Sequence, residues 1–333
     1  MQDVPHVSVV IPTRARPQML RRAIQSVLRQ TIKQLEIIVV LDGMDAVTEK
    51  ILAEFGDPRI HLVALFHMVG GSQARNIGAS AARGRYIALL DDDDEWMPRK
   101  LEAQLELADA CCGLNFVVAT EYLYRVDGQP DEVWPAHLPV AREPLSEFLF
   151  SSRGGFQTST YLCPRELMLR VPFTSSLKKH QDWDWFLQLA ALPGFQLLVV
   201  PEPLSIYWAP QRNRASVSGH LDWSFSHGWA RSRRSLMTRK AYARFLVKIC
   251  VPSARQQGAG LPAMLHLFSD LVLLGTPTPF LVAEFFVAAM LPDKLRLRLR
   301  PALQSWRSAH PALLGLLGMH THKAVPGAPY AER

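Results

Sequence analysis

The chain has 333 residues, of which 48% are hydrophobic and 20% are charged, and its formal net charge at pH 7 is +7. This composition is that of a globular protein with a sizeable core, and it excludes a disordered or collagen-like chain. The charge is unevenly distributed: residues 1–220 carry 22 basic and 25 acidic side chains, whereas residues 221–333 carry 15 basic and 5 acidic ones. We therefore expect two domains, 1–219 and 220–333, that face different partners.

The first 90 residues alternate between short apolar runs and helical patterns. The apolar runs predict strands at residues 7–11, 35–41, 60–65 and 86–90. Helices are predicted between them, at residues 19–28, 46–55 and 72–83. Alternating strands and helices indicate an α/β fold with a mostly parallel sheet flanked by helices, and ligands bind such sheets at the carboxyl ends of the strands.

Four consecutive aspartates, Asp91 to Asp94, directly follow the strand predicted at 86–90. Like charges at a strand end repel one another, and a hard divalent cation with oxygen ligands relieves this repulsion, often together with substrate phosphates. A solvated acidic loop is the alternative interpretation. The cation is favoured because Thr13, Arg14 and Asp42 also follow strand ends and are therefore expected at the same edge of the sheet.

Residues 114–162 are less regular. We predict that strands at 115–119 and 121–126 pair with each other, and that a close-approach loop at 154–160 runs into a strand at 160–163. A helix opens near His180 and has Asp182 and Asp184 in its first turn. The helix dipole favours negative charge there, so simple N-terminal capping is an alternative to a catalytic role for these acids.

The segment after Gly219 is both basic and apolar. Basic residues gather at 231–244 and 294–300, and residues 280–291 between them are apolar apart from Glu284. This run is too short to span a bilayer, which takes about 20 residues. We expect either a helix that lies in the membrane interface beside anionic lipid, or a buried helical appendage with solvated basic faces.

Several classes of protein and location are disfavoured. The four cysteines are interpreted as reduced core thiols, since no metal-ligand spacing links Cys111, Cys112, Cys163 and Cys250. Residues 1–6 lack the basic and apolar segments of a signal peptide, so we expect a cytoplasmic protein, which the membrane-interface alternative would make peripheral on the inner face of the cell membrane. No nucleic-acid-binding module accompanies the basic clusters, so nucleic acid is not an expected partner.

Taken together, these features resemble the family-2 glycosyltransferases of the GT-A fold over roughly residues 7–210. Five segments carry the resemblance through their order and spacing: 9–13, 39–43, 74–78, 86–94 and 181–184. The resemblance implies that the aspartate run contains the metal-binding DxD motif. Asp91 and Asp93 are then the residues at the metal, Mn²⁺ or Mg²⁺, with Asp93 the more direct ligand.

The resemblance also implies a donor pocket. Asp42 corresponds to the acid that hydrogen-bonds the nucleobase, commonly uracil, and Arg75 lies where a basic side chain approaches the nucleotide. Leu41 occupies a place often held by a second Asp, which leaves the preference for one nucleobase open. The expected donor-binding residues are Pro12, Thr13, Arg14, Asp42, Arg75, Asp92 and Arg214, the last as a contact of the diphosphate.

Asp182 matches the acid that serves as general base in this family. It is expected to take the proton from an acceptor hydroxyl while that oxygen attacks the anomeric carbon and inverts its configuration. Gln181 stands where Glu is frequent, and an amide cannot act as a base. Aromatic residues on the expected acceptor side stack on sugar rings or belong to the core: Phe156, Trp183, Trp185, Tyr207 and Trp208.

The sequence thus predicts an inverting, metal-dependent glycosyltransferase with a helical C-terminal extension. Its expected donor is a nucleotide-diphosphate sugar, with a UDP-sugar favoured, and its expected acceptor is a glycan or a lipid-linked glycan of a bacterial-type surface polysaccharide. Two alternatives are a non-catalytic nucleotide-sugar-binding or scaffold protein and a sugar-phosphate nucleotidylyltransferase. The latter usually has a Gly-rich loop and a Lys after the first strand, whereas residues 13–17 here contain no glycine.

Overall fold

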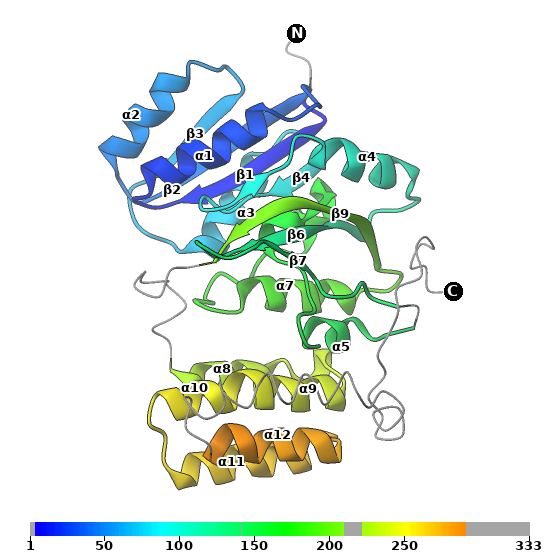
Figure 1. Ribbon diagram of the computed structural model, residues 1–333. Coiled ribbons are helices and arrows are strands. Elements are labelled where there is room, and N and C mark those ends of the chain that lie inside the picture. Colours follow the sequence, from blue (N-terminus) through cyan, green and yellow to red (C-terminus); the bar gives the residue numbers. More distant parts are fainter. Residues whose placement is uncertain (1–3, 141, 210–221, 291–333) are drawn as a thin grey trace. The chain divides into compact units, whose positions relative to one another are not determined.

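A computed structural model of the chain describes residues 4–140, 142–209 and 222–290, which form two compact units (Figure 1). Unit 1 comprises the described residues up to 142 together with residues 153–209. Unit 2 comprises residues 143–152 and 222–290.

The first half of unit 1 follows the predicted alternation of strands and helices. Its strands β1 (Val7–Thr13), β2 (Leu35–Asp42), β3 (Ile60–Leu65) and β4 (Tyr86–Leu89) are parallel and lie in the order β3-β2-β1-β4. The connecting helices are α1 (Pro17–Leu28), α2 (Ala46–Phe55) and α3 (Gly71–Ala81). Nearly all residues of β1 and all of β2 are buried, as their continuous apolar sequences predict for a sheet covered on both faces.

Beyond β4 the sheet is mixed rather than mostly parallel. The short strand β8 (Leu162–Pro164) runs antiparallel between β4 and β6 (Phe116–Arg125). Strand β9 (Gln196–Trp208) is parallel to β6, while β5 (Glu95–Trp96) and β7 (Glu132–Trp134) pair antiparallel with β9 and β6. Because β8 is antiparallel to both β4 and β6, β6 runs in the same direction as β4, and so does β9. The carboxyl ends of β4, β6 and β9 therefore point the same way.

The prediction of two paired strands at 115–119 and 121–126 is wrong. Both segments belong to the single strand β6, which pairs along its whole length with β9. The partners of Thr120, Glu121 and Tyr122 are Val200, Pro203 and Ser205, so the extra residues of this β-bulge lie in β9 and β6 continues without a break. The polar residues Thr120 and Glu121 inside β6 were therefore mistaken for a boundary between two strands.

The remaining elements of unit 1 place the second half of the sheet. Helix α4 (Lys100–Ala110) precedes β6, and a 3₁₀ turn, η1 (Thr158–Thr160), and α6 (Arg165–Arg170) flank β8. Helix α7 (Gln181–Ala190) begins directly after His180, whose φ of 63° turns the chain into the helix. One hydrophobic core joins both halves of the sheet, with side chains from β1, β4, β6 and β9.

Unit 2 is helical. One of its helices lies within residues 143–152, which the predicted domain boundary at 219 places in the first domain. Its elements are α5 (Leu145–Leu149), α8 (Trp223–Ser232), η2 (Arg234–Leu236), α9 (Arg239–Phe245), a π-helical segment η3 (Leu246–Cys250), α10 (Val251–Gln256), α11 (Leu261–Leu273) and α12 (Pro279–Met290). The Thr238 hydroxyl donates to Glu147 Oε1 at 3.0 Å, and Lys240 Nζ lies 2.7 Å from Glu147 Oε2. These contacts attach α5 to the start of α9.

Two further expectations concern the membrane and the cysteines. Among the described residues, no helix combines the length and the apolar character needed to cross a bilayer. Cys163 and Cys250 are buried thiols, but Cys111 is half-buried and Cys112 is exposed. The expectation of four core thiols is therefore wrong for the 111–112 pair, which follows the end of α4 at the surface.

Candidate functional site

The carboxyl ends of β1, β2 and β4 lie at one edge of the sheet, and the polar residues that follow them meet there. The Thr13 hydroxyl, at the end of β1, donates to Asp92 Oδ2 at 2.7 Å although the two residues are 79 positions apart. Asp92 itself is buried. Desolvation raises its pKa to about 6 against the lowering effect of Arg16.

Arg16 holds two of the four aspartates together. Its Nη1 lies 3.1 Å from Asp92 Oδ1 and 2.9 Å from Asp93 Oδ2. Arg22 adds a hydrogen bond from Nη2 to the backbone oxygen of Asp93 at 2.7 Å. Sequence reasoning selected Arg14, which is exposed and has no hydrogen bond or ion pair to the described residues, so its role at the donor remains a prediction.

Asp94, like Asp92, has a side chain that is enclosed by protein. Ser159 donates from Oγ to Asp94 Oδ2 at 2.6 Å, while Oδ1 is buried without a hydrogen-bond partner in the described part of the chain. Desolvation, followed by the charges of Asp93 and Asp91, raises the pKa of Asp94 well above its ordinary value. Ser159 Oγ also accepts from the Asp91 backbone N–H at 3.0 Å, so it fixes both ends of the aspartate run.

Arg75 joins the aspartate run to the start of α7. This buried side chain donates from Nη2 to Asp91 Oδ1 at 2.5 Å and from Nη1 to Gln181 Oε1 at 2.9 Å. Its guanidinium also lies 5.4 Å from the ring centroid of Phe173. Residues from α3, the end of β4 and α7 are thereby brought together although Arg75 and Gln181 are 106 positions apart in sequence.

The two acids in the first turn of α7 have different environments. Asp182 is half-buried, and desolvation raises its pKa to about 6, while the Trp183 backbone N–H and the charge of Arg75 act in the opposite direction. Asp184 is fully buried and accepts from Thr174 Oγ1 at 2.7 Å and from Gln188 Nε2 at 2.8 Å. Asp184 therefore has a structural role, and Asp182 is the acid that remains available to a ligand.

Asp42, the residue expected at the nucleobase, organises a loop. Its two carboxylate oxygens accept from the backbone N–H groups of Val69 at 2.6 Å and Gly70 at 3.0 Å. These bonds fix the chain just before α3, the helix that carries Arg75. A nucleobase contact by Asp42 stays a prediction, as does that of the half-buried Pro12, and Arg214 lies outside the described residues.

The aromatic candidates fall into two groups. Phe156 and Trp185 are buried in the core of unit 1, so the stacking alternative is excluded for both. Trp183, Tyr207 and Trp208 are half-buried, and Trp183 stacks on His180 with ring centroids 4.8 Å apart. Tyr207 belongs to a larger group of rings with Tyr122, Tyr124 and Trp134, which sequence reasoning missed because their three strands meet only in the folded sheet.

The donor set at the aspartate run fits a hard divalent cation. The side chains of Asp91 and Asp93 are 29% and 34% exposed, unlike those of Asp92 and Asp94, so part of each of these two side chains is accessible to a ligand. Mg²⁺ is typically held by one or two carboxylates together with water and substrate phosphates, so two accessible aspartates are sufficient ligands. One oxygen of Asp91 pairs with Arg75 and one oxygen of Asp93 pairs with Arg16. Since a carboxylate has two acceptor oxygens, each accessible aspartate can bind a cation as well.

A second group of potential metal ligands lies in unit 2. His227, His266 and Asp270 have ligand atoms within 4.8 Å of one another. Asp270 Oδ2, however, already lies 2.7 Å from His227 Nε2 and 3.0 Å from the Tyr242 hydroxyl, and it pairs with Arg231 at 3.3 Å. Hydrogen bonds and a neighbouring cation satisfy this carboxylate, which favours a structural network that joins α8, α9 and α11.

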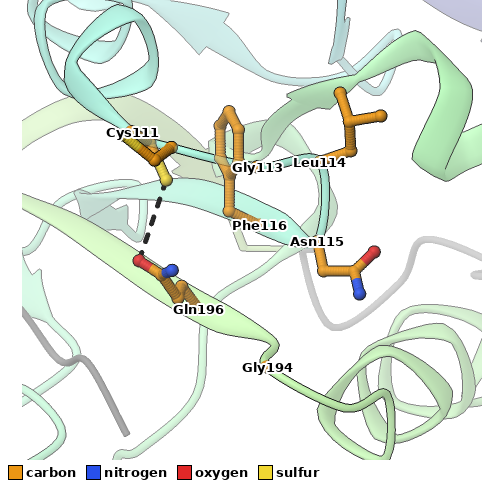
Figure 2. Close-up of a pocket in the computed structure, with 8 residues that line it drawn as sticks. Cys111, Gly113, Leu114, Asn115, Phe116, Gly194 and Gln196 are labelled. Carbon is orange, nitrogen blue, oxygen red and sulfur yellow. Dashed lines mark hydrogen bonds between the residues drawn. The ribbon is translucent and has the colours of Figure 1, made fainter. Parts of the chain in front are cut away.

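A pocket of about 330 Å³ lies at the opposite edge of the sheet (Figure 2). It is lined by the segment between α4 and β6 and by the start of β9, and Cys111 Sγ lies 3.7 Å from Gln196 Oε1 beside it. These are the amino ends of β6 and β9. The pocket is therefore separate from the edge where the polar residues meet, and it contains none of the candidate site residues.

Comparison with known sequences gives a consistent result. The sequence profile of glycosyl transferase family 2 matches residues 8–173. The amylovoran biosynthesis glycosyltransferase AmsB of Erwinia amylovora is 30% identical over 254 residues, which are 73% of this chain and 84% of that protein. The putative colanic acid biosynthesis glycosyl transferase WcaA of Escherichia coli is 33% identical over 201 residues, 58% of this chain and 69% of that protein.

Solved structures share the fold. TarS of S. aureus in complex with UDP-GlcNAc superposes with a TM-score of 0.63 at 15% identity, over 85% of this chain and 86% of that one. The mannosyltransferase PcManGT from Pyrobaculum calidifontis, in complex with GDP-Man and Mn²⁺, gives a TM-score of 0.52 at 18% identity, over 96% of this chain and 85% of that one. At this level of identity the likeness supports the GT-A fold and no further detail.

Proposed function

Since this chain belongs to glycosyl transferase family 2 and is a glycosyltransferase, we propose that it transfers a sugar from a nucleotide-diphosphate donor with inversion, in surface polysaccharide biosynthesis. The relatives named for amylovoran and colanic acid biosynthesis support the polysaccharide product. A UDP-sugar is our expected donor, while the solved relatives with UDP-GlcNAc and GDP-Man make GDP-sugars the alternative to be tested.

The observation that carries the proposal is the bridge made by Arg75. Its guanidinium bonds Asp91 after β4 and Gln181 at the start of α7, next to Asp182. A donor diphosphate at Asp91 and an acceptor hydroxyl at Asp182 would thus be neighbours. Such proximity is what a displacement at the anomeric carbon needs, because the attacking oxygen and the leaving diphosphate must lie on opposite sides of one atom.

In the proposed step the carboxylate of Asp182 takes the proton of the acceptor hydroxyl while its oxygen forms a bond to the anomeric carbon. The bond from that carbon to the diphosphate oxygen breaks, and the electron pair leaves with the diphosphate. A pKa of about 6 leaves Asp182 ionised at neutral pH and makes it a better base than an ordinary aspartate. Gln181 is neutral, so it compensates the positive charge of Arg75 less than a Glu at this position would. The remaining positive charge favours the binding of an anionic donor.

Asp91 and Asp93 are the residues proposed to hold Mn²⁺ or Mg²⁺. The cation would neutralise the negative charge that grows on the departing diphosphate. The solved relative that contains Mn²⁺ supports this dependence on a divalent metal.

Transfer from radiolabelled donors tests the proposal. UDP-, GDP-, dTDP- and CDP-sugars are offered with Mn²⁺ to the full chain, to Asp182→Asn, and to the surface control Glu202→Gln. We expect the wild type and the control to release nucleotide diphosphate from one donor class, and Asp182→Asn to lose at least 100-fold in rate, the lower range of general-base effects. An unchanged rate in Asp182→Asn would remove our base assignment.

We also propose that unit 2 attaches the enzyme to a membrane surface. Helices α11 and α12 expose large apolar side chains: Leu261 is 70% exposed, Leu273 68% and Met290 69%. The surface of a soluble helical unit rarely carries so many exposed apolar residues, whereas a membrane-interface helix requires them.

The basic residues contribute less to this attachment than the sequence suggests. Arg234 and Arg239 donate to backbone oxygens at the end of α11, including Leu274 O and Gly275 O, so they cap that helix. Lys240 pairs with Glu147 and Lys248 with Glu284. The apolar surface is therefore the main support for the membrane proposal, and the second basic cluster, at 294–300, lies outside the described residues.

Flotation with phosphatidylglycerol and phosphatidylcholine vesicles tests the attachment. We expect the full chain to float with the anionic vesicles and the Leu261→Ser/Leu265→Ser variant to float less. The control Leu169→Ser removes an exposed apolar side chain of unit 1 and should leave flotation unchanged. Equal solubility of the full chain and of a chain that ends at Gly219 would argue against attachment through unit 2.

A further inference from the structure

The carboxyl half of the sheet in unit 1 carries a row of four aromatic rings, Trp134, Tyr124, Tyr207 and Tyr122, which we call the aromatic row. Trp134 and Tyr124 stack with ring centroids 5.1 Å apart, and Tyr124 and Tyr207 stack at 5.6 Å, each pair at an interplanar angle of 25°. Tyr122 lies 6.3 Å from both Trp134 and Tyr207. The rings come from β7, β6 and β9, which lie side by side (Figure 1).

One end of the aromatic row lies at the candidate site. Ile206, next to Tyr207, pairs with Glu95, which follows Asp94 directly. Ser205 is the partner of Tyr122 on the neighbouring strand, and its hydroxyl donates to the backbone oxygen of Ser159. Ser159 in turn donates a hydrogen bond to Asp94. Desolvation raises the pKa of Tyr122 and Tyr207, and the charges of Asp94 and Asp182 raise both further, as proximity to these carboxylates requires.

The hydroxyl groups of the row have no protein partner among the described residues. The other three described tyrosines each donate a hydrogen bond: Tyr86 to Asp109, Tyr161 to Phe156 O and Tyr242 to Asp270. Tyr122, Tyr124 and Tyr207 make none. Tyr124, Tyr207 and Trp134 are also half-buried, so ring edges and polar groups both remain accessible to a ligand.

We propose that the aromatic row is a binding subsite for the acceptor, and that it takes a saccharide of more than one sugar unit. The inference rests on the proposed function, since it places the acceptor beside Asp182. Saccharides combine apolar C–H surfaces with a rim of hydroxyl groups, and tyrosine offers both an apolar ring and a polar group. Stacked rings lose little conformational freedom on binding, which favours them as contacts.

The chemistry and dimensions of the row favour a neutral, extended ligand. The aromatic row contains no charged group, and the nearby guanidinium groups are paired: Arg125 pairs with Asp131 at 2.6 Å, and Arg153, which lies 5.2 Å from the Trp134 ring centroid, pairs with Glu132. Three adjacent strands span about 10 Å, since neighbouring strands lie about 4.8 Å apart. A row of that length that starts at the aspartate run is longer than one pyranose ring, so the sugars behind the reacting unit would lie along it.

Cross-strand aromatic pairs also stabilise sheets, and this is the competing role. The hydroxyl groups separate the two roles, because ring packing needs the rings alone and saccharide binding uses the hydroxyls. Tyr124→Phe/Tyr207→Phe keeps the rings and removes two hydroxyls that have no hydrogen-bond partner among residues 4–140, 142–209 and 222–290. Tyr86→Phe is the matched control, since it removes a hydroxyl outside the row that does bond the protein, to Asp109 at 2.9 Å.

The experiment titrates the full chain, in the presence of UDP and Mn²⁺, with cellotriose, maltotriose, laminaritriose and β-1,4-galactotriose by ligand-observed NMR. Methyl glucoside and methyl galactoside serve as single-sugar probes. We expect at least one trisaccharide to bind the wild type more tightly than its methyl glycoside. Binding should weaken about fivefold for each hydroxyl removed from the row, the value of one hydrogen bond, while the melting temperature stays unchanged. Tyr86→Phe should bind as the wild type does.

The proposal is overturned if no trisaccharide binds better than a single sugar, or if Tyr124→Phe/Tyr207→Phe binds the trisaccharide as the wild type does. It is equally overturned if binding weakens only in step with a lowered melting temperature. Binding is measured without turnover, so its outcome is independent of the donor assay. Failure of the proposed function would appear instead as no release of nucleotide diphosphate from any donor.

Discussion

The titration of Asp182 offers a direct test of the proposed chemistry. Burial raises the pKa of this carboxyl from 3.8 to about 6, and only the ionised form can take a proton from an acceptor. The transfer rate should therefore fall as the pH falls through 6. At pH 5 about one tenth of Asp182 is ionised, whereas an aspartate with the ordinary pKa would still be almost fully ionised.

Arg75 provides the perturbation. Its charge lowers the pKa of Asp182, so Arg75→Met should move the acidic limb of the pH profile to higher pH. Arg75→Lys keeps the charge but loses the fork that bonds Asp91 and Gln181 at once, so its limb should stay near that of the wild type while its plateau falls.

The assay is kcat/KM for the donor at constant ionic strength between pH 4.5 and 8.5, with saturating Mn²⁺ and with folding checked by circular dichroism at each pH. An acidic limb near pH 4 in the wild type would refute the assignment of Asp182. A limb that is the same in Arg75→Met and in the wild type would refute the electrostatic link between the two residues.

Three further predictions concern the metal and the stability of unit 1. EDTA should abolish both sugar transfer and the thermal stabilisation of the protein by the donor. Mn²⁺ should restore both in the wild type but not in Asp93→Asn. Donor binding that persists in excess EDTA would contradict the metal site. Ser159→Ala removes the one side-chain donor that the described residues offer to the buried Asp94, and it should lower the free energy of unfolding by about 2 kcal/mol in urea titrations. The exposed control Ser80→Ala should lower it by less than about 0.5 kcal/mol. Gly78→Ala places a Cβ 2.4 Å from Val10 Cγ1 and should lower the free energy of unfolding by about 1–3 kcal/mol. In the control Gly228→Ala the new Cβ meets no atom of the described chain within 4 Å, so this variant should be as stable as the wild type or more stable. Equal melting temperatures for the two variants would show that the α3–β1 contact is loose.

The local pattern of the sequence predicted the first half of unit 1 almost to the residue. The strands at 35–41 and 60–65 and the helix at 46–55 appear at these positions as β2, β3 and α2, because a buried parallel strand and an amphipathic helix each leave a distinct apolar spacing. The strand-end rule also predicted that Thr13 and the aspartate run would meet, and a 2.7 Å hydrogen bond joins them.

The second half was less predictable because its pairings are antiparallel, short or bulged. The polar residues Thr120 and Glu121 inside β6 look like a strand boundary in the sequence, and the three-residue strand β8 leaves too little pattern to reveal its place between β4 and β6. The assignment of residues 143–152 to unit 2 has the same cause, since it depends on contacts of Glu147 with residues more than 90 positions away.

What the sequence determined by itself was the class of the protein: which segments of its first half form strands, and which side chains follow them. The tertiary structure decided how those side chains are used. It selected Arg16 as the cation that holds Asp92 and Asp93, buried Asp94 and Asp184 as structural acids, and set Arg75 between Asp91 and Gln181. The physical reason is range: spacing along the chain encodes local geometry, whereas burial and partners depend on groups that only folding brings within a few ångströms.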